Sequence, residues 1–228
     1  FVGVVSLAFG VVVTSSAGKE LDAAVIQILE DNILIIAPAA EETAVRQTVE
    51  QLMSEGQVDS FSYGYQTAVR TIRMAGSPDV TLSPVLVGRE DPGNYWVSGA
   101  PWGSDPNGVY TYQAAEIPAG SEVEVTLLDR SVHVLPVIGT YTIDYQGTSP
   151  YPAQGLLMSN ELILSLVQPE SVRFAITAPA GKVQAASAAF GAALPQVTVI
   201  NVPAYAARFT QSYVNLFVFA AAMAGLAL

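Results

Sequence analysis

The sequence contains no cysteine and one histidine, and these shortages exclude several kinds of chemistry. Without cysteine the chain forms no disulfide, offers no thiolate and builds no Cys-based metal site. With His133 as the only imidazole, a zinc site would have to be completed by carboxylates, and no spacing of Asp and Glu points to such a set. His133 lies in SVHVLPV at the period of a strand, so we expect it to be a structural histidine.

Basic residues are scarce as well. Nine Lys and Arg stand against 20 Asp and Glu, which gives a net charge of −11. A nucleic-acid surface needs clustered Lys and Arg against the phosphates, and a basic patch is what binds anionic lipid headgroups. The composition therefore argues against nucleic acid as a partner and against docking on anionic lipid through a basic patch. The acidic residues are scattered, as on an ordinary solvated surface.

The motifs of familiar catalytic sites are also absent. The sequence has neither a GxSxG nucleophile elbow nor a GxxxxGK[ST] phosphate loop. Glu122 and Glu124 share one face of a predicted strand, and paired carboxylates can act as acid and base, but a solvated strand face is the better interpretation. We expect no catalytic residue, no cofactor and no metal. Any ATP hydrolysis linked to this protein would then occur on another chain.

No apolar run is long enough to cross a bilayer by itself, yet an uncharged run lies at each end of the sequence. Residues 1–13 and 216–228 carry no charge, and each run is shorter than the roughly 18–20 apolar residues that a spanning helix needs. We interpret them as the ends of two transmembrane helices. The alternatives are the apolar segment of a signal peptide for the first run and a buried core helix for either run.

Charges beside the two runs predict the side of the membrane. Glu20 and Asp22 follow the first run with only Lys19 against them, and Arg208 is the nearest charge before the second run. Cytoplasmic flanks usually carry an excess of Lys and Arg. We therefore expect the block between the runs to lie on the extracytoplasmic side of the cell membrane.

A strand–helix–strand unit is predicted near each end of this block. An amphipathic helix over residues 17–31 leads into the first unit, which has a buried strand at 32–37, a helix at 41–55 and an alternating strand at 58–65. The second unit has a strand at 172–177, an Ala-rich helix at 181–194 and a strand at 196–202. Both units carry Ala-Pro-Ala between strand and helix. Pro203 then begins a helix that runs toward the second apolar run.

Residues 70–169, between the units, indicate a β-rich insertion made of short strands. A strand at 122–128 turns at Asp129 and Arg130 and returns over 131–138 as a hairpin. The remaining predicted elements are strands at 141–145 and 155–158, a helix at 160–167 capped by Ser159, and long loops at 91–112 and 145–152.

Aromatic residues gather in the first of these loops, at Tyr95, Trp96, Trp102, Tyr110 and Tyr112. Exposed aromatics in loops often mark a recognition surface for a partner or substrate. The same residues would equally serve to pack the insertion from inside. The sequence leaves both interpretations open.

The order of these elements resembles the large extracytoplasmic domain of FtsX-like ABC transporter permeases, of the macrolide-exporter and lipoprotein-release type. The segments that carry the resemblance are NILIIAP, AAEETAVRQTVEQL, VRFAIT and QVTVINV followed by a helix into LFVFAAAMAGLAL. The resemblance implies an α+β fold: a membrane-proximal core of two strand–helix–strand units with a β-rich inserted lobe, bracketed by the ends of two transmembrane helices. The expected division is 1–16, transmembrane; 17–69, first half of the core; 70–169, inserted lobe; 170–204, second half of the core; and 205–228, the helix entering the second span.

The resemblance also implies a mechanism and partners. A permease of this type pairs with a cytoplasmic ABC ATPase subunit, through parts not in this chain, and with a second permease copy. It transmits ATPase-driven motion to a lipid, lipoprotein, peptide or drug substrate, or to a partner protein outside. Two rival hypotheses are a ligand-sensing ectodomain of a two-span receptor and a membrane-tethered hydrolase that uses carboxylates.

Overall fold

The computed structural model describes residues 32–92, 95–143, 155–208, 211 and 215. Both apolar runs, the amphipathic helix expected at 17–31 and the loop expected at 145–152 lie outside the described residues. Within these described ranges, no helix is both long enough and apolar enough to span a membrane.

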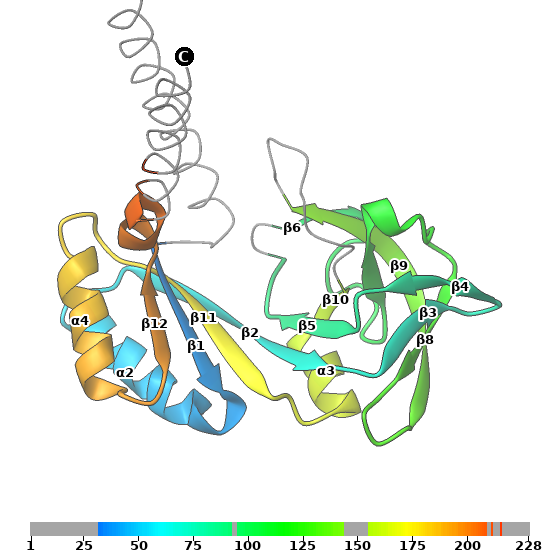
Figure 1. Ribbon diagram of the computed structural model, residues 1–228, viewed down its shortest axis with the longest axis horizontal. Helices are drawn as coiled ribbons and strands as arrows, with labels where there is room; N and C mark the ends of the chain where they lie inside the picture. The colour runs from blue at the N-terminus through cyan, green and yellow to red at the C-terminus, as the bar shows by residue number, and fades with distance from the viewer. Residues whose placement is uncertain (1–31, 93–94, 144–154, 209–210, 212–214, 216–228) are drawn as a thin grey trace, which may run out of the picture.

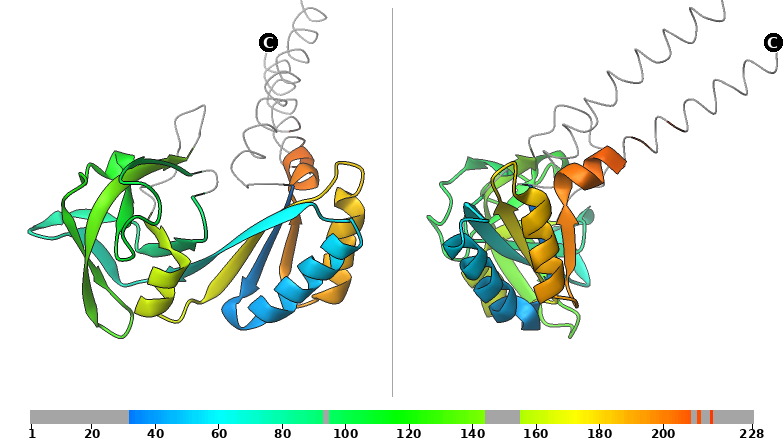
Figure 2. Two further views of the ribbon diagram at one scale, coloured as in Figure 1. Left: turned by 180° about the vertical axis from the view of Figure 1, so that it is seen from behind. Right: turned by 90° about the vertical axis from the view of Figure 1, so that its left-hand side faces the viewer.

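Four strands and two helices form one lobe, the core. The strands are β1 (Ile33–Pro38), β2 (Ser60–Ala68), β11 (Ser171–Thr177) and β12 (Thr198–Asn201), in the order β12-β1-β11-β2 with every neighbouring pair antiparallel. The helices α2 (Glu42–Ser54) and α4 (Val183–Ala193) cover the same face of this sheet (Figures 1 and 2). A short 3-10 turn, η1 (Ala39–Glu41), precedes α2.

The two predicted strand–helix–strand units are present, and they interleave. β11 lies between the two strands of the first unit, and β1 lies between the two strands of the second. This is the split βαβ arrangement of ferredoxin-like folds. The α+β class is thus confirmed. The interleaving, in which a strand of each unit lies between the two strands of the other, was not predicted.

Apolar spacing explains why these segments pack as they do. On β1 and β11, Ile35 pairs with Phe174, and both are fully buried under the helices. The buried residues of the helices recur at helical spacing: Val45, Val49 and Leu52 on α2, and Val183, Ala186 and Phe190 on α4. The strands and helices predicted for the core are confirmed to within a few residues at each end.

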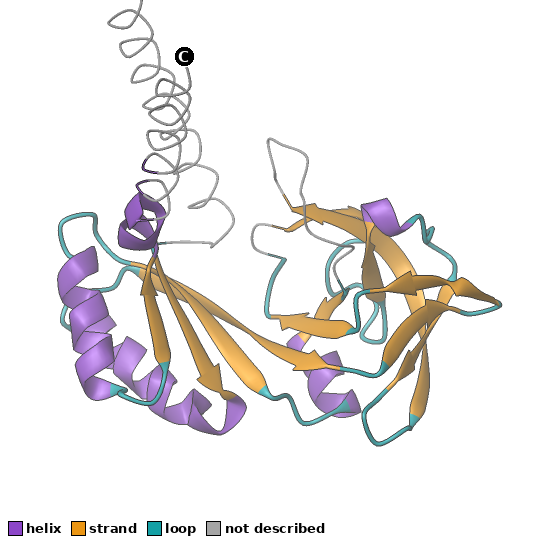
Figure 3. Ribbon diagram, viewed as in Figure 1, coloured by secondary structure: helices purple, strands orange, loops and turns teal. Residues whose placement is uncertain are grey.

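The second lobe is β-rich, as expected (Figure 3). Its strands are β3 (Thr71–Met74), β4 (Ser77–Leu82), β5 (Val85–Arg89), β6 (Tyr95–Gly99), β7 (Val109–Tyr112), β8 (Glu122–Thr126), β9 (Val132–Ile143) and β10 (Leu156–Ser159). The 3-10 turn η2 (Gln113–Ala115) and the helix α3 (Asn160–Leu166) complete it.

Two expectations in this lobe are corrected. The predicted loop at 91–112 contains β6 and β7, and the strand predicted at 141–145 is, over the described residues, the end of β9. The long β9 pairs antiparallel with β6 and parallel with β7. β6 and β7 are strands because they pair with β9, although their local sequence is typical of a loop. Strand formation depends strongly on neighbouring strands.

The hairpin and the helix cap are confirmed. β8 and β9 pair antiparallel, with Val125 opposite His133. In the turn, the Asp129 carboxylate accepts hydrogen bonds from the Ser131 hydroxyl (2.7 Å) and the Ser131 N–H (2.8 Å), and these bonds lower the pKa of Asp129. The Ser159 hydroxyl accepts a hydrogen bond of 3.2 Å from the Leu162 N–H at the start of α3.

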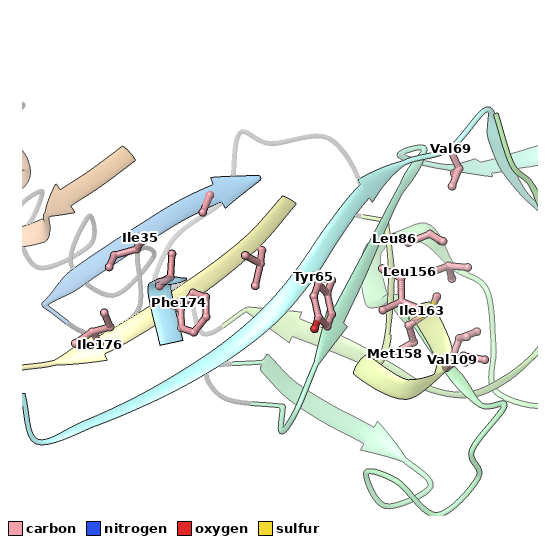
Figure 4. Packing of buried hydrophobic residues seen from close by; sticks show 14 of the residues in the cluster. Ile35, Tyr65, Val69, Leu86, Val109, Leu156, Met158, Ile163, Phe174 and Ile176 are labelled. Carbon is pink, nitrogen blue, oxygen red and sulfur yellow. The ribbon is translucent and has the colours of Figure 1, made fainter. Parts of the chain in front are cut away.

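One hydrogen-bonded sheet runs through both lobes. β2 pairs with β11 from Ser60 to Gln66 and with β5 from Gln66 to Ala68, so the same strand belongs to the core and to the inserted lobe. The buried side chains are continuous along the same path: in Figure 4, Tyr65 on β2 lies between Phe174 of the core and Leu86 of the lobe. The expected domain boundaries near residues 70 and 169 stay a prediction.

The beginning and the end of the core are tied together at one point. The Asn32 side chain donates to the Ala178 carbonyl (2.6 Å) and accepts from the Ala178 N–H (2.8 Å). The Asn32 carbonyl accepts a hydrogen bond of 3.1 Å from the Val202 N–H. The residue before β1 therefore holds the residues that follow β11 and β12.

We predict that Asn32→Ala destabilises the fold by about 1–3 kcal/mol, since the buried Ala178 loses the partners of its N–H and carbonyl groups. The measurement is urea unfolding of the chain in detergent. Asn107→Ala is the matched control, because Asn107 is exposed, and it should change the unfolding free energy by less than about 0.5 kcal/mol. Equal effects of the two substitutions would contradict the role of Asn32.

Candidate interaction surfaces

The five aromatic residues singled out in the sequence come together around β9. Tyr95 and Trp96 lie on β6, Tyr110 and Tyr112 lie on β7, and Trp102 lies in the segment between these strands. β9 pairs with both strands and contributes a further aromatic residue, Tyr141. Strand pairing thus brings residues that are distant in sequence close together in space.

Four of the five pack inward. Trp102 stacks on Tyr110 with ring centroids 5.3 Å apart and planes at 17°, and its indole N–H donates to the Glu90 carbonyl (3.3 Å). Tyr95 and Tyr112 contact Tyr141 at centroid distances of 5.3 and 5.6 Å. Tyr110 and Tyr141 are fully buried. These contacts favour the packing interpretation for the four residues, and contact with a partner or substrate stays a prediction.

Trp96 differs from the other four, with 66% of its surface exposed. Side chains alternate across a strand, and its neighbours Tyr95 and Val97 pack on the aromatic cluster. Trp96 therefore projects from the opposite face of β6, beside Thr142 of β9. It is the most exposed member of the predicted set.

Burial holds two of the cluster's phenols in their neutral form. The Tyr141 hydroxyl donates to the Gly155 carbonyl (3.0 Å), and burial, assisted by Tyr95 and Tyr112, raises the pKa of Tyr141. The Tyr110 hydroxyl donates to the Ala100 carbonyl (3.0 Å), and burial raises its pKa as well. Neither phenol is thus poised for proton transfer near neutral pH.

A second exposed apolar surface lies at the β8–β9 turn, and sequence reasoning missed it. Leu128, Val132 and Val134 are 61%, 54% and 55% exposed, and we call them the hairpin surface. The signal was present in SVHVLPV, where apolar residues occupy both faces of one strand. A hairpin with one solvated face normally alternates apolar with polar residues.

A cluster of polar side chains joins α2 to β2. The Tyr65 hydroxyl donates to the Glu42 carboxylate (2.5 Å), which also accepts from the Arg46 guanidinium (2.8 Å). Arg46 in turn lies over the Tyr63 ring, 4.2 Å from its centroid. Burial and the bond to Glu42 raise the pKa of Tyr65. These contacts lock the helix onto the strand that enters the inserted lobe.

The other candidate residues have structural surroundings. The His133 ring is half-buried opposite Val125, and its Nε2 lies 3.5 Å from the Ser131 hydroxyl. Glu124 forms an ion pair with Arg73 on β3, while Glu122 is exposed. Across the part of the chain that the structure describes, no three His, Asp or Glu residues are grouped so that they could hold a metal ion.

The comparisons with known proteins include a distant structural likeness. No known family matches the sequence, and no curated protein matches it. A crystal structure of a domain of a protein described as a permease, from Porphyromonas gingivalis, aligns with a TM-score of 0.46 at 9% sequence identity. The alignment covers 75% of this chain and 90% of that one. At this distance the likeness assigns no family, and the FtsX-like type stays a prediction.

We predict that Tyr141→Phe alters the alkaline limb of the pH–stability curve. Because the folded pKa of Tyr141 lies above its ordinary value of 10.0, its contribution is complete below about pH 10 and is lost as the pH rises further. Removing this group should make the alkaline decline in unfolding free energy shallower by up to about 1.4 kcal/mol per pH unit.

At neutral pH the same variant should be less stable by about 1–3 kcal/mol, since the Gly155 carbonyl loses its donor. The measurement is urea unfolding of both proteins at several pH values from 7 to about 11. Parallel curves for wild type and variant above pH 10 would show that Tyr141 does not contribute to alkaline unfolding.

Proposed function

We propose that this chain is the extracytoplasmic domain of an ABC transporter permease of the FtsX-like type. Its role is to transmit motion, driven by a cytoplasmic ATPase, to a lipid, lipoprotein, peptide or drug substrate or to a partner protein. The domain itself is not an enzyme in this proposal. The ATPase and a second permease copy are its partners, and the ATPase contacts parts that are not in this chain.

The observation that carries the proposal is the place where the chain enters and leaves the fold. The Asn32 carbonyl and the Val202 N–H are joined by a hydrogen bond of 3.1 Å. β1 and β12, which follow and precede these residues, are paired neighbours. Asn32 and Val202 therefore lie side by side on the core, which is consistent with two apolar runs that enter one bilayer.

Motion that arrives at this point has a stiff path into the rest of the molecule. β1 pairs with β11, β11 with β2, and β2 with β5 of the inserted lobe. Breaking this path would require the loss of several backbone hydrogen bonds at once, and the cluster of Glu42, Arg46 and Tyr65 further fixes α2 on β2. A displacement of Asn32 and Val202 should thus tilt the whole block.

The far end of the block offers a surface on which this motion can act. The turn between β8 and β9 lies on the side of the molecule opposite to residues 202–208 (Figure 1). The hairpin surface there is apolar and exposed. An apolar substrate or the apolar face of an extracytoplasmic partner is the kind of contact that fits it.

The proposal is tested by purifying the full-length protein from its native membranes and identifying what accompanies it. We expect a stoichiometric cytoplasmic ATPase, with hydrolysis that is lost when the phosphate-loop lysine of that partner is replaced. Purification with a kinase or cyclase, or alone, would instead favour a ligand-sensing ectodomain of a two-span receptor and contradict the permease proposal.

A further inference from the structure

Trp96 combines strong exposure with a position near the end of the longest strand. It pairs with Thr142, one residue before β9 ends at Ile143. Val132 of the hairpin surface begins the same strand, ten residues and therefore about 33 Å away. Trp96 and the hairpin surface thus lie at opposite ends of β9.

The carboxyl end of β9, which pairs with Trp96, lies on the same side of the molecule as residues 202–208 of the core. In Figure 1 the carboxyl end of β9 and the strand β6 lie at the top of the molecule, as does the helix at residues 202–208. The left view of Figure 2 shows the same arrangement from behind. Tyr205, on that helix, is 48% exposed. The lobe and the core therefore both present an exposed aromatic residue at this end.

We propose that Trp96 rests in the outer lipid surface and gives the inserted lobe a second contact with the membrane. This inference depends on the proposed function, which places the bilayer beyond residues 202–208. Tryptophan favours the boundary between headgroups and acyl chains, because its ring is apolar and its indole N–H still finds a polar partner there. The hydroxyl groups of its neighbours Ser98 and Thr142 suit the same polar layer.

The charge of the chain selects the kind of lipid. A net charge of −11, with Glu90 and Asp91 only a few residues before Trp96, opposes attraction to an anionic surface. A zwitterionic surface such as phosphatidylcholine imposes no such penalty. One tryptophan is a weak anchor by itself, yet tethering raises its effective concentration at the membrane, so that a weak contact is enough.

The contact of Trp96 with lipid would give the core and the inserted lobe a second fixed point when they tilt together. With Trp96 in the lipid, the lobe is held at a fixed height while the core is held at Asn32 and Val202. A tilt that lifts β6 from the membrane would release Trp96 and move the hairpin surface at the opposite end of β9.

The test uses the 228-residue chain reconstituted in phosphatidylcholine vesicles. Trp102→Phe leaves Trp96 as the only tryptophan of this sequence. We expect its fluorescence to be quenched by phospholipids that carry bromine near the headgroup end of the acyl chain. A triple variant, Trp96→Phe, Trp102→Phe and Leu128→Trp, is the matched control: its tryptophan is exposed at the hairpin turn and should be quenched by aqueous acrylamide but not by lipid.

Flotation of the vesicles separates failure of this inference from failure of the proposed function. If the chain floats with the vesicles while Trp96 is quenched by acrylamide and not by brominated lipid, the contact is wrong and membrane anchoring stands. If the chain does not float, both the contact and the membrane-anchored function are overturned. Lipid quenching of Trp96 above that of the control, in a chain that floats, supports the contact.

Discussion

The hydrogen-bonded position of β1 between β11 and β12 is the constraint on which the rest of the structure depends. Each neighbour of β1 comes from the other strand–helix–strand unit, so neither unit completes its sheet alone. The same pairing brings Asn32 beside Val202 and gathers both ends of the core at one point. The inserted lobe is then suspended between β2 and β11, and the pairing of β2 with β5 joins it to the core sheet.

This arrangement gives the molecule two ends with different surfaces. Residues 202–208 and β6, with Trp96, lie at one end, and the hairpin surface lies at the other (Figure 1). β9 connects the two ends within the lobe and pairs with β6, β7 and β8 along its length. In the proposed permease, the first end meets the membrane and the second meets the substrate or partner.

The core could be predicted because the sequence patterns of its strands and helices are local. The arrangement of the aromatic residues could not be predicted, because it depends on pairing between strands that lie far apart in the sequence. NILIIA is a short, mostly apolar run and VRFAIT is rich in β-branched and aromatic residues, as is typical of strands, and α2 and α4 show helical spacing. β6 and β7 form because they pair with β9, and local sequence alone therefore predicted a loop in this region. The aromatic residues were found, but which of them faces outward depends on strand pairing: Tyr110 is buried and Trp96 is exposed.

The central claim is that the core and the inserted lobe move as one body when the ends of the core are displaced. It is tested most directly by the distance between spin labels at Ala188→Cys on α4 and Leu128→Cys at the hairpin turn, both exposed positions in a sequence without cysteine. We predict a single narrow distance distribution that stays the same in the nucleotide-free and ATP-bound states of the complex with the proposed ATPase. A distribution that broadens or shifts with nucleotide would contradict transmission through a continuous sheet.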